Sequence, residues 1–130
     1  MIHPVFDPAL AAQIGSALDL RPPNAEALET IAKVAEERLA TDGSCFEGVI
    51  DVATGVGKTY VLAAAIDYFT GLGYRDFAVI APGRTIARKT IANFTPGHPK
   101  SLLGGMETQP RVITLNRPGF HIGSGVGRLE

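Results

Sequence analysis

The feature that most constrains this chain is the pentapeptide GVGKT at residues 55–59, which separates two apolar stretches. Residues 46–53, FEGVIDVA, have the apolar character of a short buried strand, and the residues from Lys58 to about Thr70 predict a helix. A glycine turn between a strand and a helix lets consecutive backbone N–H groups and the positive end of the helix meet one anion. The sequence therefore indicates a phosphate-binding loop.

Each residue type in this loop suits the binding of a triphosphate. Gly55 and Gly57 have no side chain to block the approach of a phosphate to the backbone. Lys58 supplies a point charge for the β- and γ-phosphates, and the Thr59 hydroxyl can ligate Mg²⁺. We therefore predict ATP and Mg²⁺ as cofactors, with Lys58 and Thr59 in catalytic roles and Thr59 as the metal ligand. The alternative is a purely structural glycine turn that Thr54 caps.

The rest of the chain alternates between helical and strand-like patterns. Helices are expected over 7–18, from a cap at Asn24 to about Leu39, over 58–70 and over 85–94, further strands over 76–81 and 111–116, and a loop over 95–110. Strands that alternate with helices form a parallel sheet with right-handed crossovers. The predicted fold class is therefore α/β.

Composition and charge narrow the class of protein. Hydrophobic residues make up 45% of the 130 residues and charged residues 19%, as in an ordinary globular domain. No apolar run reaches the ~20 residues of a membrane helix, and the N-terminus lacks a signal-peptide pattern. The single cysteine, Cys45, excludes an internal disulfide. We therefore expect a cytoplasmic protein without a membrane partner.

The charges are unevenly distributed along the chain. Residues 1–50 hold eight acidic and three basic side chains, whereas residues 75–130 hold three acidic and eight basic ones. A basic second half could meet phosphates, and the alternative is a solvated surface with scattered arginines.

Three stretches resemble the motifs of a known family. VATGVGKT (52–59) is similar to motif I of the superfamily 2 helicases and translocases, of the DEAD/DEAH-box and type III restriction-subunit kind. FAVIAPGRTIARKTIANF (77–94) resembles their motif Ia, and LRPPNAEALETI (20–31) resembles the segment upstream of motif I. The likeness runs from about Leu20 to Leu115 and implies the N-terminal part of the first RecA-like domain.

This resemblance sharpens the expected fold. It implies a P-loop NTPase with a partial RecA-like parallel sheet and flanking helices. The ATP-binding domain would span residues 23–116, after an N-terminal helix and turn (1–22) and before a glycine-rich tail (117–130).

The resemblance also implies which residues hold the nucleotide. Those around the triphosphate would be Thr54, Gly55, Val56, Gly57, Lys58, Thr59 and Tyr60. Asn24 falls on the position of the family's adenine-reading glutamine, and Arg21 could flank the base. From the sequence alone, Asn24 could equally be a helix N-cap and Arg21 an exposed turn residue.

In motif Ia, the resemblance places a group of residues at the edge of the predicted sheet, facing a nucleic-acid backbone. They are Pro82, Gly83, Arg84, Thr85 and Arg88. A helix N-terminus next to an arginine suits a phosphate oxygen, and Arg84 and Arg88 share one helix face. The alternative is an ordinary solvated helix surface.

Hydrolysis in this family also requires a Walker B pair of acids after a strand. Beyond Asp76 the acids are Glu107 and Glu130, and neither follows a predicted strand as part of such a pair. We therefore expect the ATP-binding portion of a DNA- or RNA-dependent helicase or translocase, truncated before Walker B and not catalytically complete alone. Whether this chain is itself an enzyme is left open. Its partners would be nucleic acid and the remainder of the helicase chain, including a second RecA-like lobe.

Two other functions could use the same phosphate loop. A small P-loop phosphotransferase would use the arginines of GRTIARKT (83–90) over its substrate, and a non-catalytic nucleotide-binding module would need no acid pair. Nucleic-acid-dependent ATP turnover marks the helicase, and phosphate transfer to a small acceptor marks the phosphotransferase. Tight binding without turnover marks the binding module or a fragment of the helicase.

Overall fold

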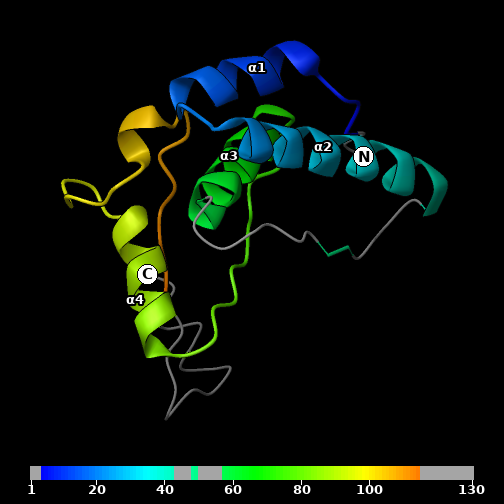
Figure 1. Cartoon of the computed structure of the whole chain (residues 1–130). Coiled ribbons are helices and arrows are strands. Elements are labelled where there is room, and N and C mark those ends of the chain that lie inside the picture. Colours follow the sequence, from blue (N-terminus) through cyan, green and yellow to red (C-terminus); the bar gives the residue numbers. More distant parts are fainter. Residues whose placement is uncertain (1–3, 43–47, 50–56, 115–130) are drawn as a thin grey trace.

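The computed structural model describes residues 4–42, 48–49 and 57–114. Within these ranges the chain forms four α-helices and one short 3₁₀ turn (Figure 1). The helices are α1 (Pro8–Ala17), α2 (Pro22–Asp42), α3 (Lys58–Gly71) and α4 (Arg84–Asn93), and the turn is η1 (Leu103–Gly105). None of the described helices is both long enough and apolar enough to cross a membrane.

The first two helices begin at residues suited to that position. The Asp7 carboxylate caps α1 by accepting a hydrogen bond from the Leu10 N–H at 3.0 Å. Pro22 and Pro23 open α2, where a missing N–H costs nothing because the first turn of a helix has no internal acceptor for it. The helix predicted over 7–18 is thereby confirmed. The prediction that Asn24 caps the second helix is wrong, since α2 begins two residues earlier and Asn24 lies within its first turn.

The core forms where α1, α2 and α3 pack against one another (Figure 1). The alanine-rich α3 lies at its centre, and Ala63, Ala64 and Tyr68 are fully buried there. Small alanines let the neighbouring helices approach closely, and Leu28 and Ala32 of α2 are each 1% exposed. The predicted helix from Lys58 to about Thr70 is confirmed. Its most deeply buried residues include these alanines, whereas Leu62 and Phe69 are only partly buried against the core.

The predicted loop over 95–110 is more ordered than its proline and glycine content indicates. It folds back from the end of α4 and contains η1, and its Leu102, Leu103 and Met106 are buried in the core. Two hydrogen bonds tie the first part of the loop to the end of α4. The Leu102 N–H donates to the Asn93 carbonyl and the Asn93 side-chain amide donates to the Lys100 carbonyl, both at 2.8 Å. This loop therefore contributes apolar side chains to the helical core.

The predicted α/β fold with a partial RecA-like parallel sheet is wrong for the described residues, which contain helices and no strand. Residues 76–81 have no regular secondary structure instead of the predicted strand, and neither do residues 111–114 of the predicted strand 111–116. Most of the predicted strand 46–53 lies outside the described residues. A strand needs a neighbour to satisfy its N–H and C=O groups, so an apolar pattern alone does not make one.

The two apolar segments that lack strand structure are also the main apolar surface of the described chain. The large hydrophobic side chains exposed there are Phe77, Val79, Ile80, Val112 and Ile113, and Ile80 reaches 95% exposure. Segment 74–83 leads away from α3 to the start of α4, which stands apart from the three packed helices in Figure 1. Burial is thus concentrated in the helical core, and the described residues of the predicted strands 76–81 and 111–116 are left at the surface.

Candidate nucleotide-binding site

The candidate site is built at the start of α3, where Gly57 turns the chain into the helix. Gly57 has a left-handed conformation, with φ 84° and ψ 54°, and its carbonyl accepts hydrogen bonds from the N–H groups of Tyr60 and Val61. Glycine adopts this conformation without the penalty that a Cβ imposes. The predicted glycine turn before the helix is therefore present at this position.

The residues that follow Gly57 occupy the first turn of α3. Lys58 is exposed, Thr59 is half-buried, and Tyr60 is 41% exposed. The backbone N–H groups that open a helix have no acceptor inside it, and they carry the positive end of the helix dipole. The first turn of α3 also contains no acidic residue. This end of the helix therefore combines the N–H groups of a first helical turn with an exposed lysine, which suits an anionic ligand.

Asn24 comes from a different helix and lies against the glycine turn. A Cβ placed on Gly57 would meet the Asn24 amide nitrogen at 3.2 Å and the Tyr60 ring at the same distance. Asn24 is only 2% exposed, and its backbone N–H donates to the Arg21 carbonyl at 2.9 Å. The structure therefore brings together Asn24 and the end of the predicted phosphate loop, 33 residues apart in the sequence. Arg21 itself is exposed just before α2.

Three of the predicted phosphate-loop residues, Thr54, Gly55 and Val56, lie outside the described residues. The close approach of Asn24 to Gly57 gives one test of the site that does not need them. We expect Gly57→Ala to lower the free energy of unfolding by about 1–3 kcal/mol, because alanine is strained at positive φ and its Cβ would press on Asn24. Urea unfolding measures this change.

The matched control for this substitution is Gly97→Ala. Gly97 also has positive φ, at 76°, but nothing lies within 4 Å of a Cβ placed there. The control therefore carries the backbone strain without the contact, and a smaller loss is expected. Equal losses in the two variants would contradict the contact with Asn24.

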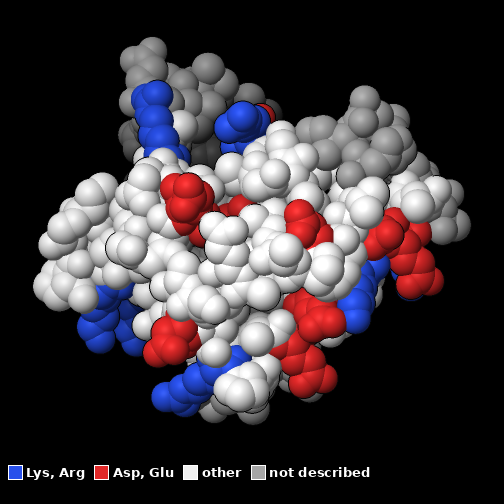
Figure 2. Space-filling model, turned by 90° about the horizontal axis from the view of Figure 1, so that it is seen from above, with Lys and Arg blue, Asp and Glu red and all other residues white. Residues whose placement is uncertain are grey.

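The predicted motif Ia residues lie at the start of α4, away from the core. Gly83 is the N-cap and Arg84 the first helical residue. All five predicted residues of this group, Pro82, Gly83, Arg84, Thr85 and Arg88, are exposed. The helix predicted over 85–94 is confirmed as Arg84–Asn93, and it carries three basic residues and no acid. Figure 2, which looks down on the side of α1 and α2, shows acidic side chains interspersed with basic ones on that face.

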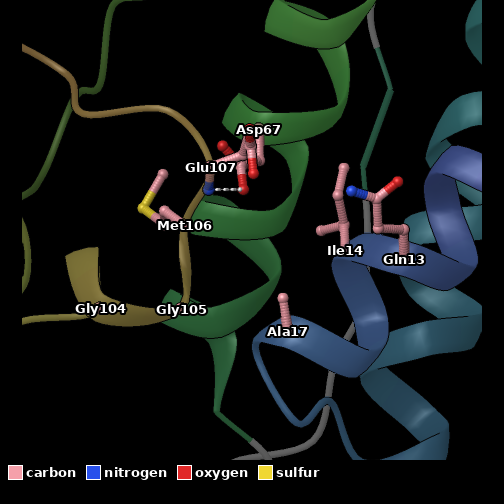
Figure 3. A pocket seen from close by; sticks show the side chains of 8 residues that line it. All are labelled: Gln13, Ile14, Ala17, Asp67, Gly104, Gly105, Met106 and Glu107. Atoms are coloured by element: carbon pink, nitrogen blue, oxygen red, sulfur yellow. Dashed lines mark hydrogen bonds between the residues drawn. The ribbon is translucent and has the colours of Figure 1, made fainter.

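One polar residue that stands out in the structure was not singled out from the sequence. Asp67 on α3 is 4% exposed, and its carboxylate binds the loop after η1 (Figure 3). It borders a pocket of about 350 Å³ between α1 and that loop. The pocket is lined by Gln13, Ile14, Ala17, Asp67, Gly104, Gly105, Met106 and Glu107. The sequence feature that could have pointed to Asp67 is its position as the one acidic residue in the apolar middle of the predicted helix 58–70.

Comparison with known proteins places the chain in a family. Residues 17–111 match the family described as type III restriction enzyme, res subunit. A curated relative, the probable type III restriction-modification enzyme HindVIP Res subunit of Haemophilus influenzae, is 44% identical over 55 residues. That alignment covers 42% of this chain and 11% of the relative, so the chain spans a small part of the relative's length. No solved structure matches the chain. Because the family match covers most of the chain and includes the Gly57-Lys58-Thr59 turn and α4, the chain belongs to the family of the type III restriction enzyme res subunit.

Proposed function

We propose that this chain is the ATP-binding portion of a helicase-like motor in a Res subunit. The observation that carries the proposal is the start of α3. There Gly57 is in the left-handed conformation, Lys58 is exposed, and Asn24 packs against the turn. The family match over residues 17–111 supports this function over a small phosphotransferase.

The residues proposed for the nucleotide are those predicted from the sequence. Thr54, Gly55, Val56, Gly57 and Tyr60 would surround the phosphates with Lys58, and Thr59 would ligate Mg²⁺. Asn24 and Arg21 would lie on the side of the base, and the position of Asn24 beside Gly57 supports this. Bound Mg²⁺ would neutralise phosphate charge, while Lys58 and the N–H groups of the first turn would orient the β- and γ-phosphates.

The proposed partner of α4 is a nucleic-acid backbone. Pro82, Gly83, Arg84, Thr85 and Arg88 are exposed at the N-terminal end of a helix without acids, which suits phosphate oxygens. The name of the relative, a restriction-modification enzyme, favours DNA over RNA. The further partner would be the rest of the Res subunit, including a second RecA-like lobe. In this proposal residues 23–116 form the ATP-binding domain, 1–22 precede it, and 117–130 follow as a tail.

The test of this function is a titration of the chain with fluorescent ADP and Mg²⁺, beside Lys58→Ala. We expect the substitution to weaken binding about 10- to 100-fold, because Lys58 contributes a charge-assisted contact to the phosphates. Lys100→Ala is the matched control, since Lys100 is also an exposed lysine and lies in the loop after α4. It should leave the affinity unchanged.

The outcome of the titration separates the candidate functions. Failure of the folded parent chain to bind ADP would refute the ATP site, and equal losses in both variants would show that the lysine charge acts only at long range. Turnover that rises when DNA is added would support the motor function. Binding without turnover would support a nucleotide-binding module that depends on the rest of the subunit for hydrolysis.

A further inference from the structure

Asp67 connects the helix that begins at the candidate nucleotide site to a distant loop. It lies nine residues after Lys58 on α3, which is about 13 Å along the helix axis. One carboxylate oxygen accepts the Glu107 N–H at 2.9 Å, and the other accepts the Thr108 N–H at 2.7 Å. Figure 3 shows the loop running past α3 at this point, with the Asp67 side chain directed at it.

The chemistry of this contact requires a carboxylate. Two consecutive N–H groups need two acceptors side by side, and a carboxylate provides both at once. An asparagine would provide one oxygen and would turn its own NH₂ group toward the second donor. Because Asp67 is 4% exposed, its burial is costly unless both oxygens are hydrogen-bonded, and charge-assisted bonds to N–H groups offset that cost.

The loop that Asp67 binds is also held by hydrogen bonds of its own and by buried side chains. The Gln109 side-chain amide donates to the carbonyls of Leu103 and Met106, at 3.0 and 3.2 Å. The side chains of Leu103 and Met106 are both buried in the core. Residues 103–109 are therefore held together by hydrogen bonds within the loop. The Asp67 carboxylate joins this loop to α3 by two further hydrogen bonds.

We infer that Asp67 is a positioning residue that couples nucleotide binding at the start of α3 to the segment 107–114. This inference rests on the proposed function. A ligand that fixes the first turn of α3 also restricts the motion of the rest of this rigid helix. The Asp67 carboxylate then transmits that restriction to Glu107 and Thr108, from which the chain continues into residues 109–114.

The test is hydrogen exchange of individual backbone amides, followed by NMR, with and without saturating Mg²⁺–ADP. In the parent chain we expect the Glu107 and Thr108 amides to exchange at least about threefold more slowly when ADP is bound. The Leu102 amide is the internal reference, because it donates to the Asn93 carbonyl of α4 and does not contact Asp67. Its exchange should not respond to ADP.

Asp67→Asn provides the second measurement. In this variant we expect the two amides to exchange about tenfold faster and to lose their response to ADP, with ADP affinity within about threefold of the parent. Asp76→Asn is the matched control, since Asp76 is exposed and should leave both properties unchanged. A role in stability alone would make the Leu102 amide respond to ADP as much as these two amides do, because ligand binding stabilises the whole fold.

Each outcome decides the inference. If ADP binds the parent but the Glu107 and Thr108 amides do not respond, or if Leu102 responds equally, the coupling is refuted while the ATP site stands. If the parent does not bind ADP, the proposed function and the coupling fail together. Should Asp67→Asn fail to fold, the response of the parent amides against Leu102 decides the question by itself.

Discussion

Replacing Tyr68 with alanine is expected to lower the free energy of unfolding by about 3–5 kcal/mol, a large share of the roughly 5–15 kcal/mol that stabilises an ordinary domain. Tyr68 is fully buried on α3, and its ring meets that of Phe69 edge-on at 5.3 Å. Its hydroxyl also accepts the Asp7 N–H at 3.0 Å, which fixes the start of α1. The substitution therefore leaves a cavity in the core and removes an anchor of the N-terminal helix.

Tyr68→Phe separates these two contributions. The ring and its packing remain, so only the hydrogen bond to Asp7 is lost, at a cost of about 1 kcal/mol. Urea unfolding of the parent and both variants gives the comparison. A loss for alanine no larger than that for phenylalanine would show that Tyr68 is not at the centre of the core.

The second large effect is expected for Gly105→Ala, in the turn η1. A Cβ at this position would lie 2.8 Å from the Ala17 carbonyl oxygen and 3.0 Å from the Leu18 side chain. The oxygen belongs to the backbone at the end of α1 and cannot move aside as a flexible side chain could. We expect overpacking to lower the free energy of unfolding by about 1–3 kcal/mol, measured by urea unfolding.

The neighbouring Gly104 is the matched control for this prediction. Nothing lies within 4 Å of a Cβ placed on Gly104, and it is exposed in the same turn. Gly104→Ala should therefore change the free energy of unfolding by less than about 1 kcal/mol. If both alanines were tolerated equally, η1 would not pack against the end of α1 as described.

The helices were predictable from the sequence because their signals are local. Asp7 before Pro8 and the apolar run after Lys58 set helix starts that the structure confirms. The start of α2 was misplaced because Asn24 is a good N-cap residue by type, whereas the two prolines before it already belong to the helix. The local sequence thus favours a helix start at Pro22 as well as one after Asn24, and in the structure α2 begins at Pro22.

The sheet was not predictable, because strand structure depends on partners that an apolar pattern does not contain. Residues 76–81 and 111–114 have the composition of buried strands, yet in the described chain they form no strand and remain largely exposed. The fold class was inferred from the alternation of elements, and that inference required the strands to find one another.

The candidate site was predictable only in part. Gly57, Lys58 and Thr59 form a contiguous motif, so the sequence shows them together. The contact between Asn24 and Gly57 was suggested only by resemblance, since helix packing alone brings them together. Asp67 was missed because its partners are backbone N–H groups 40 and 41 residues away. Almost every residue type has a backbone N–H, so the side chains of Glu107 and Thr108 do not indicate this contact.

The exposure of residues 77–81 has a consequence for how this chain behaves at high concentration. FAVIA is an apolar, uncharged and proline-free run without regular secondary structure, which is the composition that drives self-association into intermolecular β-structure. Arg75 and Asp76 stand at one end of it and Pro82 at the other. Charged residues and proline in such flanking positions act as gatekeepers that oppose aggregation. The colloidal stability of this chain therefore depends on three residues beside the run, outside the helical core.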